Sequence, residues 1–340
     1  MKGARLTMRR TIPVLIAILV AVTAVSAASA SSRDVRLNLV AYSTPKPVLT
    51  KIISDFQKTP EGSGVSFNAS YGGSSAQAAA VKAGLPADVV ILNTGADMLD
   101  LADAGILNPK WDRQSYKGVA WQSVVVFALR DGNPKKIKGW NDLLKPGVEI
   151  VTPNPFTAGI AKWNILGAYS AQRALGKTDA QAQNFVNKLF THVVAQDSSG
   201  SNATNTFLSG KGDVLLTFES EAINARAAGR NIQYIIPRQT MLIDVYTGVT
   251  TRTANKDTAN AFLRFLKSPA EQQVLADNGY RPVNKAVAKA NANRFPVRPG
   301  EITIDNKVIG GWRVANKKWF DPNNSIMARI EKALGVSTSG

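Results

Sequence analysis

The stretch ADVVILN, residues 87–93, is a short apolar run that follows Pro86 and ends with Asn93. Such a run is typical of a parallel β-strand that is buried on both faces of its sheet. A helix is predicted directly after it, over residues 96–104, and Gly105 is placed to end that helix. A buried strand followed at once by a helix predicts an α/β unit.

The same alternation extends in both directions along the chain. Residues 35–41 alternate between apolar and polar side chains, which predicts a strand, and Thr44-Pro45 then predicts the start of a helix with proline at its first position. Toward the C-terminus we predict strands over 122–130, 148–152, 192–196, 213–219 and 232–236. Between them we predict helices over 161–174, 179–190, 202–209 and 220–229. The last third is mainly helical, with a capping box at Ser268 and a stop at Gly279. This order predicts an α/β fold with mostly parallel sheets.

Residues 1–30 are typical of a secretory signal peptide. Four basic residues precede an apolar stretch over 12–25, and Ala28-Ser29-Ala30 is a cleavage signal of the A-x-A kind. The alternative is an uncleaved membrane anchor, although the apolar stretch is short for a span. The chain contains no cysteine, which excludes disulfides and a lipid anchor on cysteine. We therefore expect a soluble protein outside the inner membrane, in the periplasm.

The composition favours an anionic partner. The formal net charge is +17, and removal of the leader leaves 37 basic and 24 acidic residues, a balance of +13. Nucleic acid, an anionic membrane surface and a small anion all remain candidates on this ground. The basic residues form no long run, so a solvated positive surface is the simplest interpretation of any single cluster.

Signatures of catalysis are weak or absent. His192 is the one histidine, and it lies at the start of a strand-like run, where a structural role is expected. With no second histidine and no cysteine, a common zinc site is not expected. The sequence also lacks a G-x-S-x-G nucleophile elbow, a phosphate-binding P-loop and a dinucleotide fingerprint. We predict no catalytic residue, no metal and no cofactor; an exported hydrolase, the remote alternative, would have to use His192.

Small polar turns precede several of the predicted helices. They lie at residues 43–44, 71–75, 157–160 and 198–202, and three of them contain glycine. A helix N-terminus offers unpaired N–H groups and the positive end of the helix dipole. Several such ends directed at one point would bind an anion. Any one of these turns, taken alone, is ordinarily a loop with an N-cap.

Several stretches resemble the periplasmic sulfate-binding protein family of sulfate and thiosulfate ABC importers. The longest match is Gly-Asn-Pro at 132–134, Trp-Asn-Asp-Leu-Leu-Lys-Pro-Gly-Val at 140–148 and Thr-Pro-Asn-Pro at 152–155. Shorter matches follow in family order: 72–74, 162–164, 204–207, 212–215, 280–282 and 310–312. The resemblance covers roughly residues 34 to 330.

This resemblance implies a type II periplasmic binding protein fold, in which two α/β lobes close around the ligand. We expect residues 33–118 and 243–340 to form the first lobe, residues 119–242 to form the second, and crossover strands to lie near 119–126 and 240–248. It also implies that sulfate is held dehydrated by donors at helix N-termini, and that the lobes dock on an ABC transporter permease. The expected protein is a monomer that is not an enzyme and does not bind nucleic acid.

The resemblance also carries a set of ligand-binding positions. Ser74 matches a serine donor, Gly159 a backbone donor, and Ser43, Ile160 and Gly200 replace residues that donate from their backbone. Two positions depart from the family more seriously, because Ala158 replaces a serine hydroxyl and Phe218 replaces a tryptophan indole N–H. The hydroxyls of Ser75 and Thr157, or ordered water, are candidates for replacing those lost donors. The expected site is therefore Ser43, Ser74, Ser75, Thr157, Ala158, Gly159, Ile160, Gly200 and Phe218.

The exact oxyanion stays open at this point. Sulfate carries no proton at neutral pH and suits a pocket made only of donors, whereas phosphate keeps a proton and requires an acceptor. Glu219 and Glu221 flank Phe218 and are the nearest acidic candidates, although structural hydrogen bonds at a helix start are the favoured interpretation of both. Phosphate, molybdate and tungstate remain alternatives to sulfate or thiosulfate. A basic adhesin or nucleic-acid binder is suggested only by the net charge.

Overall fold

The computed structural model describes residues 1, 3 and 35–338 of the chain. Every helix and strand reported below lies in one compact unit, Asp34–Gly340. The predicted signal peptide, residues 1–30, falls outside the described residues apart from Met1 and Gly3. Among the helices of the described part, none is long and apolar enough to cross a membrane.

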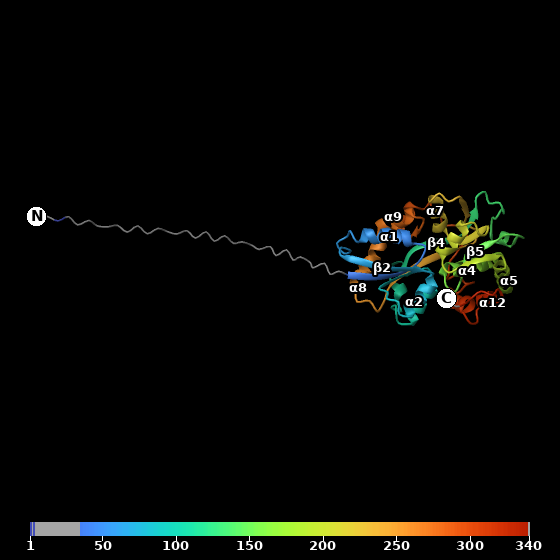
Figure 1. The fold of residues 1–340 in the computed structure, drawn as a ribbon, viewed down its shortest axis with the longest axis horizontal. Coiled ribbons are helices and arrows are strands. Elements are labelled where there is room, and N and C mark those ends of the chain that lie inside the picture. The colour runs from blue at the N-terminus through green and yellow to red at the C-terminus, as the bar shows by residue number, and fades with distance from the viewer. Residues whose placement is uncertain (2, 4–34, 339–340) are drawn as a thin grey trace. The chain divides into compact units, whose positions relative to one another are not determined.

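Strands of the described residues form one curled sheet (Figure 1). Its main path runs β2-β1-β3-β9-β4-β7-β5-β6, and β8, β10 and β11 attach beside it. The strands are β1 Val35–Tyr42, β2 Val65–Gly72, β3 Val89–Leu92, β4 Val119–Arg130, β5 Ile150–Pro153, β6 Val193–Asp197, β7 Val214–Phe218, β8 Ile232–Ile235, β9 Thr240–Val249, β10 Arg281–Pro282 and β11 Glu301–Ile302.

Parallel pairing dominates on both sides of the sheet, whereas at its centre it is limited to the short pair of β11 with β9. β1 pairs in parallel with β2 and β3, and β5 pairs in parallel with β6 and β7. The two long strands β4 and β9 are antiparallel to each other, and they pair antiparallel with β7 and β3. The prediction of mostly parallel sheets is therefore wrong for the centre, where β4 and β9 join two parallel groups of strands.

Helices cover the sheet. They are α1 Lys46–Phe56, α2 Ser74–Lys82, α3 Gly95–Asp103, α4 Gly159–Ala174, α5 Asp179–Phe190, α6 Gly200–Leu208, α7 Glu219–Ala227, α8 Lys256–Leu266, α9 Pro269–Asp277, α10 Lys285–Ala290, α11 Gly311–Ala315 and α12 Ile326–Ala333. Most of α4 is buried, whereas α1 buries one face through Val48, Leu49, Ile52 and Phe56, as its apolar spacing predicts.

The observed helix starts agree only in part with the predicted ones. Ser268 accepts a hydrogen bond from the Glu271 N–H and Pro269 opens α9, which confirms the N-cap but not the full capping box, because the Ser268 N–H donates to the Phe265 carbonyl. Thr44-Pro45 is different, because α1 begins at Lys46 with Pro45 as its N-cap and no side-chain cap. The helices predicted from 161 and 202 begin two residues earlier, at glycines. Glycine has a low intrinsic helix propensity, so the sequence pattern places these starts later than they are. Nothing steric prevents glycine from occupying the first helical position.

Segments far apart in the sequence lie side by side. In Figure 1, α8 and α9 lie with α1, and α12 lies near α5. Arg313 of α11 bonds Asp103 of α3, whereas Lys318 bonds Asp179 of α5 at 2.8 Å. The C-terminal segment thus contacts α3, which follows β3 of one parallel group, and α5, which precedes β6 of the other. The C-terminal ends of β1, β3, β5 and β6 lie close to one another, because Gly200 contacts Thr44 and Ile160, and Gly159 contacts Asn93.

Candidate anion-binding site

The starts of α2, α4 and α6 meet around Gly73. A β-carbon added to Gly73 would lie 2.3 Å from the carbonyl oxygen of Thr157 and 2.5 Å from that of Ser198. The Ala76 N–H in the first turn of α2 donates to the same Thr157 carbonyl at 3.0 Å. The loops that precede α4 and α6 therefore close against the N-terminus of α2, although about 85 and 125 residues of sequence separate them from it.

Gly200, the first residue of α6, brings in the remaining predicted positions. A β-carbon there would lie 3.0 Å from Thr44 Cγ2, 3.4 Å from Ile160 Cγ2 and 3.9 Å from Phe218 Cε2. The next residue, Ser201, donates its hydroxyl to Ser43 Oγ at 3.0 Å. The structure thus brings together all four predicted turns, which come from different parts of the chain.

Unpaired amide groups mark these helix N-termini. Among the residues that the structure describes, no acceptor is found for the N–H groups of Ser74, Ser75, Gly159, Ile160 and Gly200. The first N–H groups of a helix have no partner within the helix, and a buried N–H without an acceptor is costly. Three helix dipoles also present their positive ends at this point. The arrangement can hold an anion by neutral donors.

The predicted hydroxyl donors are directed elsewhere. Ser74 Oγ donates to Asp97 Oδ2 at 2.6 Å and accepts from the Asn93 N–H, while Ser75 Oγ donates to Asp97 Oδ1 at 2.8 Å. Thr157 Oγ1 donates to the Asn154 carbonyl at 3.4 Å. Each hydroxyl has a single proton to donate. In this arrangement the backbone N–H groups of Ser74 and Ser75 remain without an acceptor in the described part of the chain, while their hydroxyl protons hold Asp97.

Asp97 forms a buried charge network beside the α2 N-terminus. The residue is 4% exposed, and its Oδ1 lies 3.5 Å from Nζ of Lys162, which is 6% exposed. Asp97 belongs to α3 and Lys162 to α4, so the pair joins the two groups of elements. Because the two charges balance and the serine hydroxyls satisfy the carboxylate, the network adds no net charge to the site.

The two positions that depart from the family both present buried apolar groups. Phe218 is 1% exposed, and its ring centroid lies 5.6 Å from that of Tyr42. The nearby Trp121 indole N–H donates to the Tyr42 hydroxyl at 3.1 Å, so it is already used. Burial raises the pKa of Tyr42 far above its usual range, which keeps that hydroxyl neutral. Ala158 is buried as the N-cap of α4, and its side chain makes no capping hydrogen bond.

The two glutamates beside Phe218 have separate roles. Glu219 is buried and holds Arg281 through two contacts of 2.7 and 3.3 Å. Glu221 accepts a hydrogen bond from Thr204 Oγ1 of α6 at 2.9 Å. Burial raises the pKa of Glu221 to about 7, despite the opposing effect of that hydrogen bond. Both carboxylates thus have structural partners at the start of α7.

Three residues near the site were not predicted as part of it: Asn93, Asp97 and Lys162. The carbonyl of Asn93 accepts from the Trp163 indole at 2.6 Å, and its side chain packs on Gly159. Asn93-Thr94 forms a small polar turn between β3 and α3, so the same pattern that marked the other turns also marks this one. Asp97 and Lys162 lie inside helices, where sequence offers no sign that they face each other.

His192 has a backbone partner in the structure. A ring nitrogen of His192 bonds the Val148 carbonyl at 3.0 Å, a contact between neighbouring loops. In the part of the chain that the structure describes, no group of three or more His, Cys, Asp or Glu side chains could hold a metal ion.

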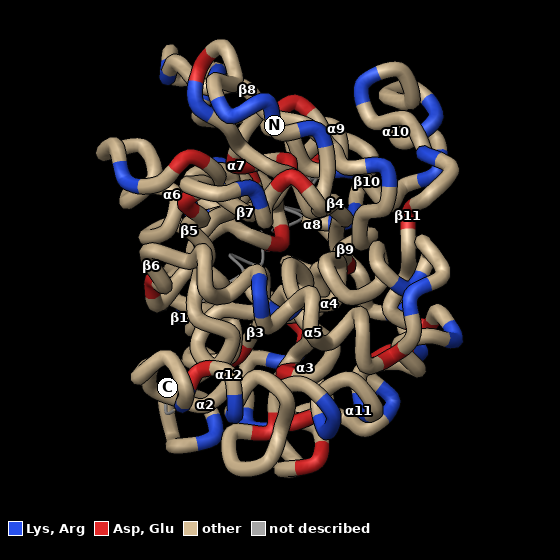
Figure 2. Tube along the Cα trace, turned by 90° about the vertical axis from the view of Figure 1, so that its right-hand side faces the viewer, with Lys and Arg blue, Asp and Glu red and all other residues tan. Residues whose placement is uncertain are grey.

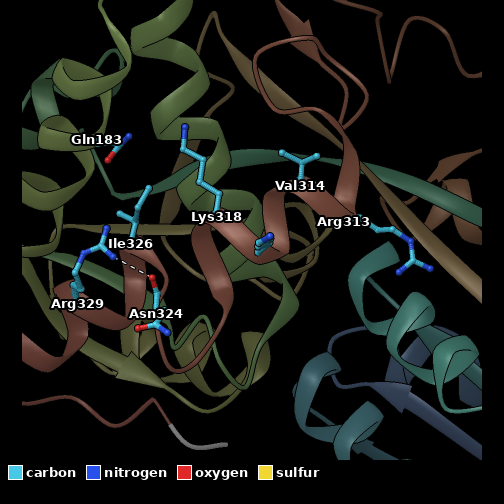
Figure 3. A pocket seen from close by; sticks show the side chains of 8 residues that line it. Gln183, Arg313, Val314, Lys318, Asn324, Ile326 and Arg329 are labelled. Carbon is cyan, nitrogen blue, oxygen red and sulfur yellow. Dashed lines mark hydrogen bonds between the residues drawn. The ribbon is translucent and has the colours of Figure 1, made fainter.

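A second basic region lies away from these helix starts. A cavity of about 710 Å³ is lined mainly by the C-terminal segment, including Arg313, Lys318 and Arg329, whose side chains are drawn in Figure 3. Arg313 pairs with Asp103 and Lys318 with Asp179, while Arg329 donates to the Asn324 carbonyl. Acidic partners thus neutralise two of the four cations that line this cavity, whereas Lys317 and Arg329 have none among the described residues. In Figure 2, Lys and Arg are likewise interspersed with Asp and Glu along the chain.

Comparison with known proteins places this geometry in a family. The family model of bacterial extracellular solute-binding proteins matches residues 37–281 of this chain. A sulfate-binding protein of Escherichia coli K12 is 36% identical over 319 residues, covering 90% of this chain and 96% of its own. A thiosulfate-binding protein of Pseudomonas aeruginosa is 37% identical over 274 residues, covering 78% of this chain and 82% of its own. The chain belongs to the family of bacterial extracellular solute-binding proteins.

A solved structure gives the same result for the fold. The sulfate-binding protein SubI of Mycobacterium tuberculosis superposes with a TM-score of 0.81 at 38% sequence identity, covering 84% of this chain and all of the other. The two-lobed periplasmic binding protein fold that the sequence predicts is thereby confirmed.

Proposed function

We propose that this protein captures sulfate, with thiosulfate as a further ligand, and delivers it to an ABC importer. One observation carries the proposal: the N-termini of α2, α4 and α6 meet with unpaired amide groups at their first residues. Such an arrangement suits a fully ionised oxyanion, because it supplies donors and no acceptor with a full charge. The names of the relatives, sulfate-binding and thiosulfate-binding proteins, support the same ligand class.

The ligand contacts we propose come mainly from the backbone. The donors are the N–H groups of Ser74, Ser75, Gly159, Ile160 and Gly200, with Ser43 and Thr157 in the loops that complete the pocket. Ala158 and Phe218 form its apolar wall. Hydrogen bonds to a charged group contribute about 1.5–3 kcal/mol each, so several neutral donors suffice to bind a dianion without a neutralising cation.

We assign the lobes as the resemblance implies, with residues 33–118 and 243–340 in the first and residues 119–242 in the second. Hydrogen bonds that then cross between the lobes at the site include Ala76 N–H to the Thr157 carbonyl, Trp163 indole to the Asn93 carbonyl, and Ser201 Oγ to Ser43 Oγ. This arrangement corresponds to a closed form, and we propose that hinge movement in β4 and β9 opens it.

The proposed setting follows from the same family. The protein acts outside the inner membrane, in the periplasm, after cleavage of its signal peptide, and it works as a monomer that docks on a membrane permease. It has no catalytic role and no nucleic-acid partner. Lys and Arg are interspersed with Asp and Glu along the chain, which agrees with a surface that is not built for a polyanion (Figure 2).

Titration calorimetry on the purified protein tests the ligand. A panel of sulfate, thiosulfate, phosphate, molybdate and tungstate should give saturable one-to-one binding of sulfate. If the protein prefers another tetrahedral oxyanion, the proposed site stands and only the proposed ligand changes. The apolar residues at 158 and 218 are compatible with that outcome. Absence of a response to every oxyanion at millimolar concentration would overturn the proposed function.

A further inference from the structure

Asn93 has an unusual side chain for a buried residue. It follows β3 directly, it is 2% exposed, and its Oδ1 is buried without a hydrogen-bond partner. Its Nδ2 likewise donates to no other residue that the structure describes. The carboxamide therefore has no partner among the described residues, and its Oδ1 is closed off from solvent as well.

The backbone of Asn93 is fixed from two sides. Its N–H donates to Ser74 Oγ at 3.1 Å, and its carbonyl accepts from the Trp163 indole at 2.6 Å. Ser74 opens α2, and Trp163 lies in the second turn of α4. These two bonds place Asn93 between the helix N-termini that form the proposed site.

The carboxamide lies against the first residue of α4. A β-carbon added to Gly159 would be 1.8 Å from Asn93 Oδ1, so only glycine leaves room for this side chain. Rotation about the last side-chain bond exchanges Oδ1 and Nδ2. The amide donor can therefore face the same point as the free N–H groups of Gly159 and Ile160.

An unpartnered buried amide is costly, and a ligand removes that cost. Leaving a buried donor or acceptor unsatisfied costs about 1–3 kcal/mol, so most buried polar groups in proteins have partners. An oxyanion oxygen at the α4 N-terminus would accept from Nδ2. The hydroxyl protons of Ser74 and Ser75 cannot serve the ligand in this arrangement, because both donate to Asp97.

We propose that Asn93 is a ligand-binding residue whose carboxamide donates a hydrogen bond to the bound tetrahedral oxyanion. It supplies a side-chain donor in place of the hydroxyl missing at Ala158 and the indole missing at Phe218. This role rests on the proposed function and names a specificity-determining residue of the same site.

The test compares Asn93→Leu and Asn93→Asp with the unmodified protein in sulfate calorimetry. Leucine has nearly the same volume and no donor, so sulfate binding should weaken by roughly 10- to 150-fold. Aspartate brings a carboxylate toward the anion, so at pH 8 sulfate binding should fall further and the ratio of phosphate to sulfate affinity should rise. Asn231→Leu, at an exposed asparagine, is the matched control and should bind sulfate normally.

Thermal unfolding without ligand separates binding from structure. Asn93→Leu removes a buried oxygen that has no hydrogen-bond partner among the described residues, so its melting temperature should equal or exceed that of the unmodified protein. A lowered melting temperature together with normal sulfate affinity would assign Asn93 a structural role and overturn the inference. Normal sulfate affinity in both variants would overturn it too. If the unmodified protein binds none of the oxyanions, the proposed function fails, and the role of Asn93 fails with it.

Discussion

Gly73→Ala is expected to weaken ligand binding by preventing closure of the site. The new β-carbon would lie 2.3 Å from the Thr157 carbonyl oxygen and 2.5 Å from that of Ser198. Real contacts of this kind are rarely below 3.0 Å, so the loops before α4 and α6 must move away from α2 by about 0.7 Å or more. Both neighbours are backbone atoms, so no side-chain rotation can relieve the clash.

That displacement acts on the donors directly. The Ala76 N–H bond to Thr157, now 3.0 Å, is lost or lengthened, and the N–H groups of α4 move away from those of α2. Loss of one or two hydrogen bonds to a charged ligand costs about 1.5–3 kcal/mol each, which predicts sulfate affinity at least about tenfold weaker. An open form relieves the clash, so the melting temperature without ligand should change little.

Calorimetry with sulfate measures the effect, and Gly139→Ala provides the control. A β-carbon at Gly139 meets no atom within 4 Å, and its φ of −171° is extended backbone open to any residue. The control should bind sulfate as the unmodified protein does. Equal affinities for Gly73→Ala and Gly139→Ala would refute the view that these loops must touch for binding.

Three further substitutions test separate parts of the structure. Ala158→Ser adds a hydroxyl at the uncapped start of α4, so sulfate affinity in calorimetry should rise about tenfold; a gain in stability of about 1 kcal/mol without a gain in affinity would show that the hydroxyl only caps the helix. Glu219→Gln leaves the buried Arg281 with Glu301 as its remaining carboxylate, so urea denaturation should show a loss of about 3 kcal/mol, and a loss below about 1 kcal/mol would contradict a structural ion pair. Burial raises the pKa of Glu331 from 4.5 to about 7, so the unfolded chain releases this proton at lower pH and stability should fall as pH rises from about 4.5 to about 7. Glu331→Gln should flatten that slope and add on the order of 2 kcal/mol at pH 8, whereas an unchanged slope would disprove the assignment.

The elements that sequence predicts best are those whose signal is local. Residues 87–93 contain β3 because a fully apolar run between turns has few alternatives, and Ser268-Pro269 marks the start of α9 through local capping chemistry. Antiparallel pairing of β4 with β9 escapes such reasoning, because it joins segments more than a hundred residues apart. The sequence does not predict β2, because this strand is only half-buried along much of its length and its apolar pattern is weak.

The candidate site divides in the same way. Turns that precede helices are visible in sequence, and four of them meet in the structure around Gly73 and Gly200. The directions of the hydroxyl protons are not visible, because they depend on Asp97, which is 23 residues from Ser74 in the chain. The buried contact of Lys162 with Asp97 likewise joins two helices that are far apart in the sequence, and nothing within either helix predicts it.

Selenate, a tetrahedral dianion with the shape of sulfate, gives the most direct test. Anomalous diffraction from crystals of the protein with selenate would locate the selenium atom. We expect one peak within hydrogen-bonding reach of the N–H groups of Gly159 and Gly200, with no Lys or Arg side chain in contact. A peak found only among the basic residues of the C-terminal cavity, or none at all, would contradict the account.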